Sequence, residues 1–387
     1  MKLIRVNKSG LKSLLLGTLF YFILIDSGGA TGIRNITISL FFIIGFLSMF
    51  FIKYHLSNKI LLIFLSILFS IFYAIFIGII NNIYYIKVIT LLFFLLFIII
   101  VFYTFILFSK QVIINALIFG GYLFSTGIFI VHFMIFIEIV PVEILLIGLN
   151  ILNGYFHPFG ILGFEYYSIY FQATLTLVPL AITAYLYNKK MAFYIFLFAL
   201  AISLSRFGII TILLFVFFVN MFGEKKLSYA ISKYFLFFIL SFTLFYFYTY
   251  LFNYENYIST NTSANVRIGH LISLVDSFSF NNFLFGQGGG SYFYTIGRDM
   301  YVDNVELTQL ELIRKYGIIF FIIFHLIINS LFLLLYRIKE YSFIIIIFSF
   351  YFVSLSNPVL TSLTFSIFFG FGIAELSKIN KKDLNAQ

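Results

Sequence analysis

The chain is a succession of apolar runs separated by short polar connectors, and one polar interval late in the chain is much longer than the others. A helix that crosses about 30 Å of hydrocarbon needs about 20 mostly apolar residues, and fewer where neighbouring helices shelter it. The runs therefore predict an all-α polytopic membrane protein with about twelve transmembrane helices. The predicted spans are residues 12–25, 36–52, 60–80, 88–108, 112–137, 167–187, 191–204, 207–222, 230–251, 312–335, 343–355 and 359–375.

Charge decides two divisions that hydropathy leaves open. Residues 191–222 are interrupted only by Ser205 and Arg206, and residues 343–376 only by the Ser-Asn-Pro step at 356–358, so each run is either one long helix or two short ones. With both runs split, 17 of the 24 lysines and arginines fall on one side, which the positive-inside rule makes the cytoplasmic side. Both termini are then cytoplasmic, and the large loop between the ninth and tenth spans is extracytoplasmic.

Composition narrows the class further. Hydrophobic residues make up 62% of the 387 residues and charged residues 10%, whereas soluble proteins carry roughly a quarter charged residues. The absence of cysteine excludes disulfides, zinc fingers and thiol chemistry. The net charge of +10 comes from lysines and arginines scattered between apolar runs, where they set topology, so we predict no nucleic-acid partner. Residues 1–387 are predicted to form a single integral membrane domain with an uncleaved first span.

Two of the predicted extracytoplasmic loops are large enough to contribute to a functional site. Residues 138–166 are too apolar for a free loop, and we expect them to lie on the membrane surface or to re-enter it. Residues 252–306 form the large polar loop and carry the candidate site. Five of the seven basic residues on this side are arginines, and guanidinium binds phosphate bidentately while it stays charged. The two interpretations are a site for a phosphorylated ligand and arginines that merely extend to the interface.

Arg206 is the most informative single residue. It lies in SLSRFGII, residues 203–210, between two apolar helices. A charged group there costs on the order of 3 kcal/mol unless it meets water or a partner. We interpret Arg206 as a functional residue; the alternative is an arginine at a hairpin tip that reaches the membrane surface.

The large loop contains a segment with helical periodicity, residues 265–278. Arg267 and His270 lie three positions apart and are neighbours on such a helix, so they can hold a phosphate and supply a group that titrates near neutral pH. The alternative is the solvated polar face of an amphipathic helix. The apolar face of that helix would hold Ile268, Leu271, Ile272, Val275 and Phe278.

A glycine-rich segment, FGQGGGS, follows at residues 285–291. It lacks the Lys-Ser/Thr pair of a P-loop and the strand-to-helix context of a dinucleotide fingerprint. We therefore predict a tight turn that brings backbone close to a ligand and not a nucleotide site.

Acidic residues lie at the end of the loop. Asp303 and Glu306 have the spacing of a capping box that starts the next helix. Either acid can also act as a general base for a sugar hydroxyl. Glu311 lies one turn before Arg314 and Lys315 and is expected to pair with them.

Taken in order, these motifs resemble those of the Wzy-type O-antigen and capsular polysaccharide polymerases, within the O-antigen ligase and polymerase superfamily. That family shows a serine-arginine step between two spans, an arginine followed by a Leu/Phe-x-Gly-x-Gly segment, and an acid or histidine with asparagine before a helix that ends in Gly-Ile-Ile. The resemblance covers residues 191–321. Ligases commonly carry a histidine where this chain has Asp303, which favours a polymerase. The matching segments are SLSRFGII, Arg267, FLFGQGGGS and DNVELTQLELIRKYGIIFF.

The resemblance implies a glycosyltransferase of the bacterial inner membrane that uses no nucleotide sugar, no metal and no other cofactor. A growing glycan on undecaprenyl diphosphate is transferred to a sugar hydroxyl of a new lipid-linked repeat unit, and the lipid diphosphate leaves. The predicted diphosphate ligands are Arg206, Arg267 and Arg298. The candidate proton acceptors are Asp303, Glu306 and His270. The loop also contains Tyr292, Tyr294 and Tyr301. These tyrosines either stack on sugar rings or are ordinary residues of the membrane interface.

Three other classes share this outline: an O-antigen ligase, a lipid-linked oligosaccharide flippase or other transporter, and a glycosyltransferase that uses polyprenyl-phosphate sugars. Transporters tend to show repeats with discontinuous helices, and no internal repeat is evident here. The third class usually carries an acidic pair in its first external loop, where this chain has only Asp26. The expected partners are an undecaprenyl-diphosphate-linked oligosaccharide, the lipid bilayer and, by resemblance, a flippase and a chain-length regulator.

Overall fold

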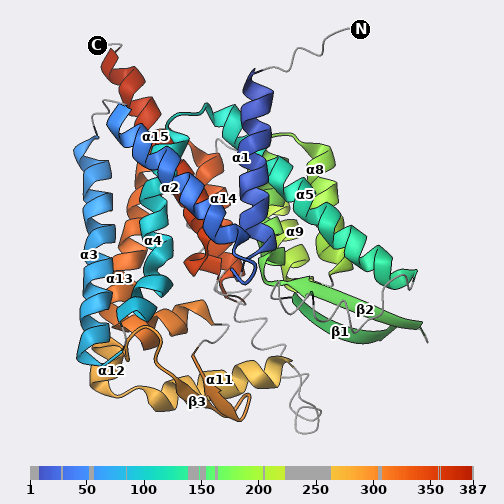
Figure 1. The fold of residues 1–387 in the computed structure, drawn as a ribbon, viewed down its shortest axis with the longest axis vertical. Helices are drawn as coiled ribbons and strands as arrows, with labels where there is room; N and C mark the ends of the chain where they lie inside the picture. The colour runs from blue at the N-terminus through green and yellow to red at the C-terminus, as the bar shows by residue number, and fades with distance from the viewer. Residues whose placement is uncertain are drawn as a thin grey trace.

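Long helices run side by side in the computed structural model of the protein, and a smaller layer of short helices and strands covers one end of them (Figure 1). The structure describes residues 8–27, 29–51, 56–83, 85–137, 148, 154–161, 164–203, 205–222, 263–303, 307–355, 357 and 359–385.

The helices of the bundle begin and end close to the polar connectors of the sequence. Among the described residues, five helices, α1, α2, α3, α5 and α13, are long and apolar enough to cross a membrane, which makes this a mainly helical membrane protein. The bundle helices are α1 (Lys8–Ile25), α2 (Ile33–Phe51), α3 (Asn58–Ile80), α4 (Tyr85–Phe105), α5 (Lys110–Phe136), α7 (Leu177–Leu186), α8 (Lys190–Ile202), α9 (Arg206–Phe222), α13 (Thr308–Arg337), α14 (Tyr341–Val353) and α15 (Leu363–Asn385).

A helix overlaps every predicted span except residues 230–251, which lie outside the described residues. Both runs with open divisions are split, as the charge pattern predicts. Helices α8 and α9 are separate, and α14 and α15 are separated by a 3-10 turn, η3 (Val359–Thr361). Each interruption places polar residues where a continuous helix would have buried them in hydrocarbon.

Small residues allow α1 and α5 to pack closely. A Cβ on Gly17 would lie 2.6 Å from the carbonyl oxygen of Ala116, and a Cβ on Gly120 would lie 2.7 Å from the carbonyl oxygen of Gly17. Lipid tails are as apolar as the helix surfaces, so helix association in a membrane relies on close van der Waals contact of this kind.

The prediction of a helix over residues 167–187 is wrong in its first half. Strands β1 (Gly154–Ile161) and β2 (Phe164–Phe171) form an antiparallel hairpin, and a 3-10 turn, η1 (Gln172–Thr176), leads into α7. Strand β2 reads FEYYSIYF, and aromatic and β-branched residues favour extended backbone. Hydropathy does not separate an apolar strand from a buried helix. The end of the predicted surface loop 138–166 is therefore paired strand, and the fold is not purely α-helical.

Polar contacts identify one end of the bundle, where α1 begins and α15 finishes (Figure 1). Lys110 Nζ lies 2.7 Å from a carboxylate oxygen of Glu340 and 5.6 Å from the centroid of the Tyr187 ring. Lys378 donates to the carbonyl oxygen of Phe108 at 2.6 Å. These contacts join the connectors before α5, between α7 and α8, and between α13 and α14, so basic connectors gather at this end.

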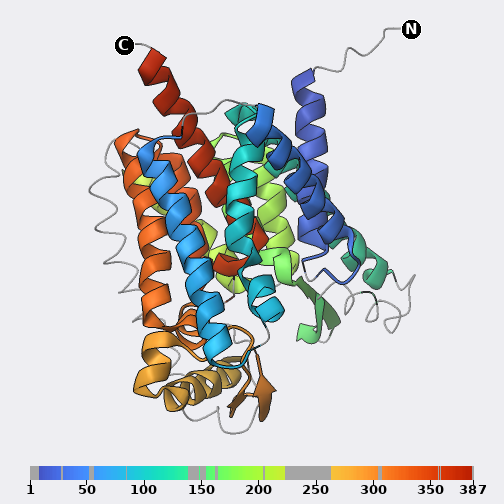
Figure 2. The ribbon, with the colours of Figure 1, turned by 60° about the vertical axis from the view of Figure 1, so that its left-hand side comes forward.

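The opposite end carries the β1–β2 hairpin and the smaller layer (Figures 1 and 2). The layer consists of α11 (Ser263–Ser277), α12 (Phe280–Phe285), β3 (Phe293–Thr295) and β4 (Met300–Val302). A small apolar cluster joins α11, both strands and α13, so the layer is attached to the bundle through α13. The members of this cluster are Leu274, Phe293, Val302 and Leu310.

Candidate functional site

Helix α13 is broken at Gly317, where φ is 80° and ψ is 168°. The break separates a short N-terminal part, called the arm below, from the apolar part of the helix. Such an end leaves carbonyl groups that need other donors. The backbone N–H of Gln287 donates to the carbonyl of Arg314 at 2.7 Å, and that of Gly288 donates to the carbonyl of Lys315 at 2.9 Å. The glycine-rich segment therefore completes the hydrogen bonding of the broken helix.

Glycine is required on both sides of this contact. A Cβ on Gly317 would lie 2.2 Å from the carbonyl oxygen of Leu284, and a Cβ on Gly286 would lie 2.5 Å from that of Lys315. Both glycines have positive φ, which other residues rarely adopt. The sequence predicts a turn close to a ligand, whereas the structure shows a turn whose backbone lies against α13.

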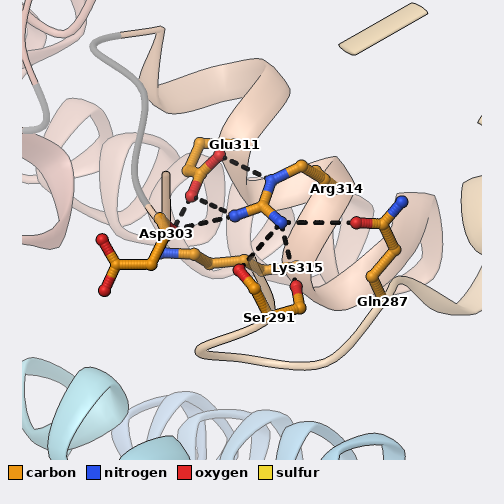
Figure 3. Close-up of polar contacts among 6 residues, drawn as sticks. All are labelled: Gln287, Ser291, Asp303, Glu311, Arg314 and Lys315. Carbon is orange, nitrogen blue, oxygen red and sulfur yellow. Dashed lines mark hydrogen bonds and ion pairs between the residues drawn. The ribbon is translucent and has the colours of Figure 1, made fainter. Parts of the chain in front are cut away.

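Arg314 lies inside the turn, completely buried, with an acceptor for each guanidinium nitrogen (Figure 3). Its Nε and Nη2 donate to the carboxylate of Glu311 at 3.0 and 2.8 Å. Nη2 also donates to the carbonyl of Asp303 at 2.9 Å. Nη1 donates to Oγ of Ser291 at 2.9 Å and to Oε1 of Gln287 at 3.3 Å. This arginine holds the arm, the glycine-rich segment and both ends of the β3–β4 hairpin together.

Lys315 and Asp303 complete a charged group that we call the Arg314 cluster: Asp303, Glu311, Arg314 and Lys315. Lys315 Nζ lies 2.8 Å from a carboxylate oxygen of Glu311, and its side chain is only 6% exposed. Asp303 acts electrostatically on Lys315, while its carboxylate points away from Arg314 in Figure 3. The predicted pairing of Glu311 with Arg314 and Lys315 is confirmed. Two acids balance two bases, which limits the cost of burying the charges.

The capping box predicted for Asp303 is wrong. Helix α13 begins at Thr308, and Leu307 before it has a non-helical conformation. Asp303 follows β4 instead, and Glu306 lies outside the described residues. The start of α13 is bonded to a distant segment, because the Thr308 hydroxyl donates to the carbonyl of Asn357 at 2.9 Å. A tertiary contact replaces the local cap.

Helix α11 confirms the helix predicted at residues 265–278, but its faces are reversed. His270 is 1% exposed, and its Nδ1 lies 2.6 Å from Oγ1 of Thr295. A Cβ on Gly269 would lie 2.4 Å from Gly297, so only a small residue lets the hairpin turn approach. The polar face therefore packs against β3 and its turn, and the apolar face is on the surface. The exposed apolar residues are Ile268, Ile272 and Val275.

Arg298 lies in the exposed turn of the β3–β4 hairpin. Next to it, Asp299 adopts φ 51° and accepts a hydrogen bond from the hydroxyl of Tyr294. That hydrogen bond raises the pKa of the Tyr294 hydroxyl above its ordinary value. Arg298 is thus at the outer surface of the layer, apart from the buried Arg314 cluster.

For Arg206 and Arg267 the structure describes only the position of the backbone. Arg206 is the first residue of α9, and Arg267 lies in the second turn of α11. Their side chains lie outside the described part of the structure, so their grouping with Arg298 at one diphosphate stays a prediction.

The α8–α9 junction, where Arg206 begins α9, packs against α7. A Cβ on Gly208 would lie 2.8 Å from Oγ of Ser205 and 3.2 Å from Cγ2 of Val178. Just before Val178, Oγ1 of Thr176 lies 3.5 Å from Oγ1 of Thr364 in α15. Helix α7 therefore contacts the junction at Val178 and the start of α15 at Thr176.

A second polar group, which we call the break cluster, lies at that interruption. It consists of Tyr170, Thr308, Gln309, Ser354 and Asn357. Gln309 Nε2 donates to Oγ of Ser354 at 2.9 Å, and Asn357 Nδ2 donates to the Tyr170 hydroxyl at 3.4 Å. Oε1 of Gln309 is buried with no hydrogen-bond partner among the described residues. An unmet buried acceptor costs about 1–3 kcal/mol, which a ligand hydroxyl would relieve.

The sequence alone does not identify the break cluster as a site. Its members come from β2, the arm of α13 and the segment that follows α14, and the only local signal is the polar Ser-Asn-Pro step at residues 356–358. Within the described residues, no group of three or more histidine, aspartate or glutamate side chains is arranged to hold a metal ion.

Comparisons with protein families, with curated proteins and with solved structures find nothing that matches this chain. The chemistry of the site follows from its own residues. Hydroxyl and amide groups at the helix interruptions, with arginines on neighbouring segments, lie at one end of an apolar bundle.

Proposed function

We propose that the protein is a multi-pass glycosyltransferase of the bacterial inner membrane that polymerises undecaprenyl-diphosphate-linked oligosaccharide repeat units into O-antigen, capsular or exopolysaccharide chains. One observation carries the proposal. The α8–α9 junction that bears Arg206 connects through α7 and Thr176 to the helix interruption beside the break cluster. The arm of α13 then joins that cluster to the layer of residues 263–303. These contacts support the proposal because they link the segment that begins with Arg206, the polar groups of the break cluster and the layer.

The proposed topology has twelve spans with both termini in the cytoplasm. Residues 230–251 would be the ninth span and residues 252–306 the extracytoplasmic loop after it. The basic connectors around Lys110 and Lys378 support this orientation, because they gather at the end opposite the layer and the positive-inside rule makes that end cytoplasmic.

In the proposed reaction, a hydroxyl of the acceptor sugar attacks the anomeric carbon of the donor glycan, and the bond from that carbon to the diphosphate oxygen breaks. Asp303 takes the hydroxyl proton, with Glu306 as the alternative base. Asp303 directly follows β4, and its carboxylate points away from Arg314 in Figure 3. His270 is buried and contacts Thr295, so its role in this proposal is to hold the β3–β4 hairpin against α11. The arginines that would neutralise the leaving diphosphate are Arg206, Arg267 and Arg298.

The test is an in vitro assay with the purified protein and lipid-linked repeat units from its own host, with products resolved by chain length. Wild type is expected to produce a ladder, and Arg206→Ala and Arg267→Ala are expected to lose it while they stay folded. Arg337→Ala is the matched control, because this exposed arginine ends α13, and it should leave the ladder unchanged.

Other outcomes would assign a different class. Translocation of the same lipid in sealed vesicles without a ladder would indicate a flippase. Transfer of a finished glycan to a lipid acceptor, one unit per acceptor, would indicate an O-antigen ligase. A ladder that survives Arg206→Ala and Arg267→Ala together would remove both arginines from the diphosphate site.

A further inference from the structure

The outer face of the β3–β4 hairpin presents two tyrosines that the reaction above does not use. Tyr294 and Tyr301 are direct partners across the strands, and they are 44% and 69% exposed. Their ring centroids lie 5.7 Å apart, with the ring planes at 68°. Successive strand residues point to opposite faces, and three of the four strand neighbours of these tyrosines are buried, while Met300 at the start of β4 is exposed. The buried neighbours are Phe293, Thr295 and Val302.

The hairpin is a rigid support for this pair. Arg314 donates to the carbonyl of Ser291, just before β3, at 3.2 Å and to the carbonyl of Asp303, just after β4, at 2.9 Å. Its guanidinium also lies 4.5 Å from the centroid of the Phe293 ring, a cation–π distance. One buried side chain thus holds both ends and the inner face of the hairpin.

A polar group lies beside the aromatic rings. The hydroxyl of Tyr294 donates to the carboxylate of Asp299, which orients the ring. A carboxylate has about four acceptor positions, so Asp299 can also accept hydrogen bonds from ligand hydroxyls. A pyranose ring needs this combination, because one of its faces is a row of C–H groups and its rim carries hydroxyls. The C–H face packs on the electron-rich face of an aromatic ring.

We infer that Tyr294, Asp299 and Tyr301 form a subsite for one pyranose residue of the glycan. The inference rests on the proposed function for the source of that glycan. Tyr301 precedes Asp303 by two residues, so a sugar on the tyrosine pair is held close to the proposed base. The subsite binds the acceptor or the growing chain through its sugars, independently of the diphosphate.

The experiment measures sugar binding without catalysis. The probe is the lipid-free oligosaccharide released by mild acid from the lipid-linked repeat units of the host. Saturation-transfer NMR and titration give its Kd for the full-length protein in nanodiscs. Tyr301→Ala and Asp299→Asn are expected to weaken binding roughly threefold to tenfold. Ile296→Ala is the control, because it removes an apolar side chain, 60% exposed, from the same turn, and it should bind as wild type does.

The outcomes separate the subsite from the polymerase. Weaker sugar binding by both variants supports the subsite even if no ladder forms, in which case only the proposed function fails. A wild-type ladder with unchanged sugar binding in both variants overturns the subsite and leaves the polymerase in place. Absence of binding by wild type also overturns it.

A last experiment tests whether the outer face of the β3–β4 hairpin contacts the membrane surface and not a sugar. The chain has no cysteine, so Ile296→Cys takes a single fluorescent label. Quenching by lipid-bound quenchers, with sugar binding unchanged by Tyr301→Ala, would make the tyrosines an interfacial anchor and overturn the subsite.

Discussion

Arg314 and Glu311 form a buried bidentate ion pair across one turn of α13, with Nε and Nη2 of the arginine at 3.0 and 2.8 Å from the two carboxylate oxygens. Lys315 shares the same carboxylate at 2.8 Å. Glu311 is thus the acid that both buried cations contact, and Asp303 is the second acid of the cluster. Much of the organisation of the layer depends on Glu311.

We therefore expect Glu311→Gln to destabilise the protein by about 3–5 kcal/mol, because two buried cations lose their shared anion. Chemical or thermal unfolding in detergent measures this. Glu340→Gln is the control: its partner Lys110 is partly exposed, and we expect a loss of about 1 kcal/mol or less. Equal effects of the two substitutions would contradict the role of the Arg314 cluster.

Gly317→Ala is expected to prevent the docking of the glycine-rich segment. The new Cβ meets the carbonyl of Leu284, and the left-handed backbone alone costs about 1–2 kcal/mol with a side chain. Limited proteolysis should show faster cleavage of residues 263–303. In contrast, Gly127→Ala in α5 meets open space and should stabilise its helix by up to about 1 kcal/mol. Identical proteolysis of both variants would show that the break does not depend on glycine.

The buried contact between His270 and Thr295 predicts a structural role for both residues. His270→Ala and Thr295→Val should each reduce stability by about 1–3 kcal/mol, because each leaves a buried polar partner without its hydrogen bond. The pH profile of the polymerisation rate should stay as in wild type. A rate that falls by roughly 10²–10⁴-fold in folded His270→Ala, with a lost limb of the profile, would instead make His270 the base.

Asp26 predicts a pH dependence of stability. Burial raises the pKa of its carboxyl, but the hydrogen bonds from the N–H groups of Arg34 and Thr31, together with the charge of Arg34, lower it overall. A group with a lowered folded pKa contributes stability above its unfolded pKa of about 3.9, and the contribution is lost as the pH falls through the folded value. Tm of wild type should therefore fall as the pH is lowered from about 5 towards the folded pKa of Asp26.

Asp26→Asn should flatten that part of the pH profile, with Tm below wild type at pH 7 and a difference between the two proteins that shrinks as the pH falls. The control is Asp276→Asn, an exposed acid on α11, which should follow the wild-type profile. If Asp26→Asn and wild type lose the same number of degrees on acidification, Asp26 does not carry the dependence.

Local pattern was sufficient for much of the fold. Apolar runs long enough to span a membrane predict helices, and the described part of the structure has helices in these runs. The exception is residues 167–176. The prediction fails for those residues because a short strand and a short buried helix can have the same apolar composition. The splits before Arg206 and before Leu363 agree with the division of these runs that the charge pattern predicts.

By itself, the sequence determined that the chain is a helical membrane protein, where most of its helices lie, and that Glu311 pairs one turn along with Arg314 and Lys315. These features depend on neighbours within one or two turns. Only the tertiary structure decided that the glycine-rich segment serves the break at Gly317, that His270 is buried, that Asp303 is no helix cap, and that the break cluster exists. Each of these depends on backbone or side-chain contacts between segments distant in sequence, and periodicity carries no information about such contacts.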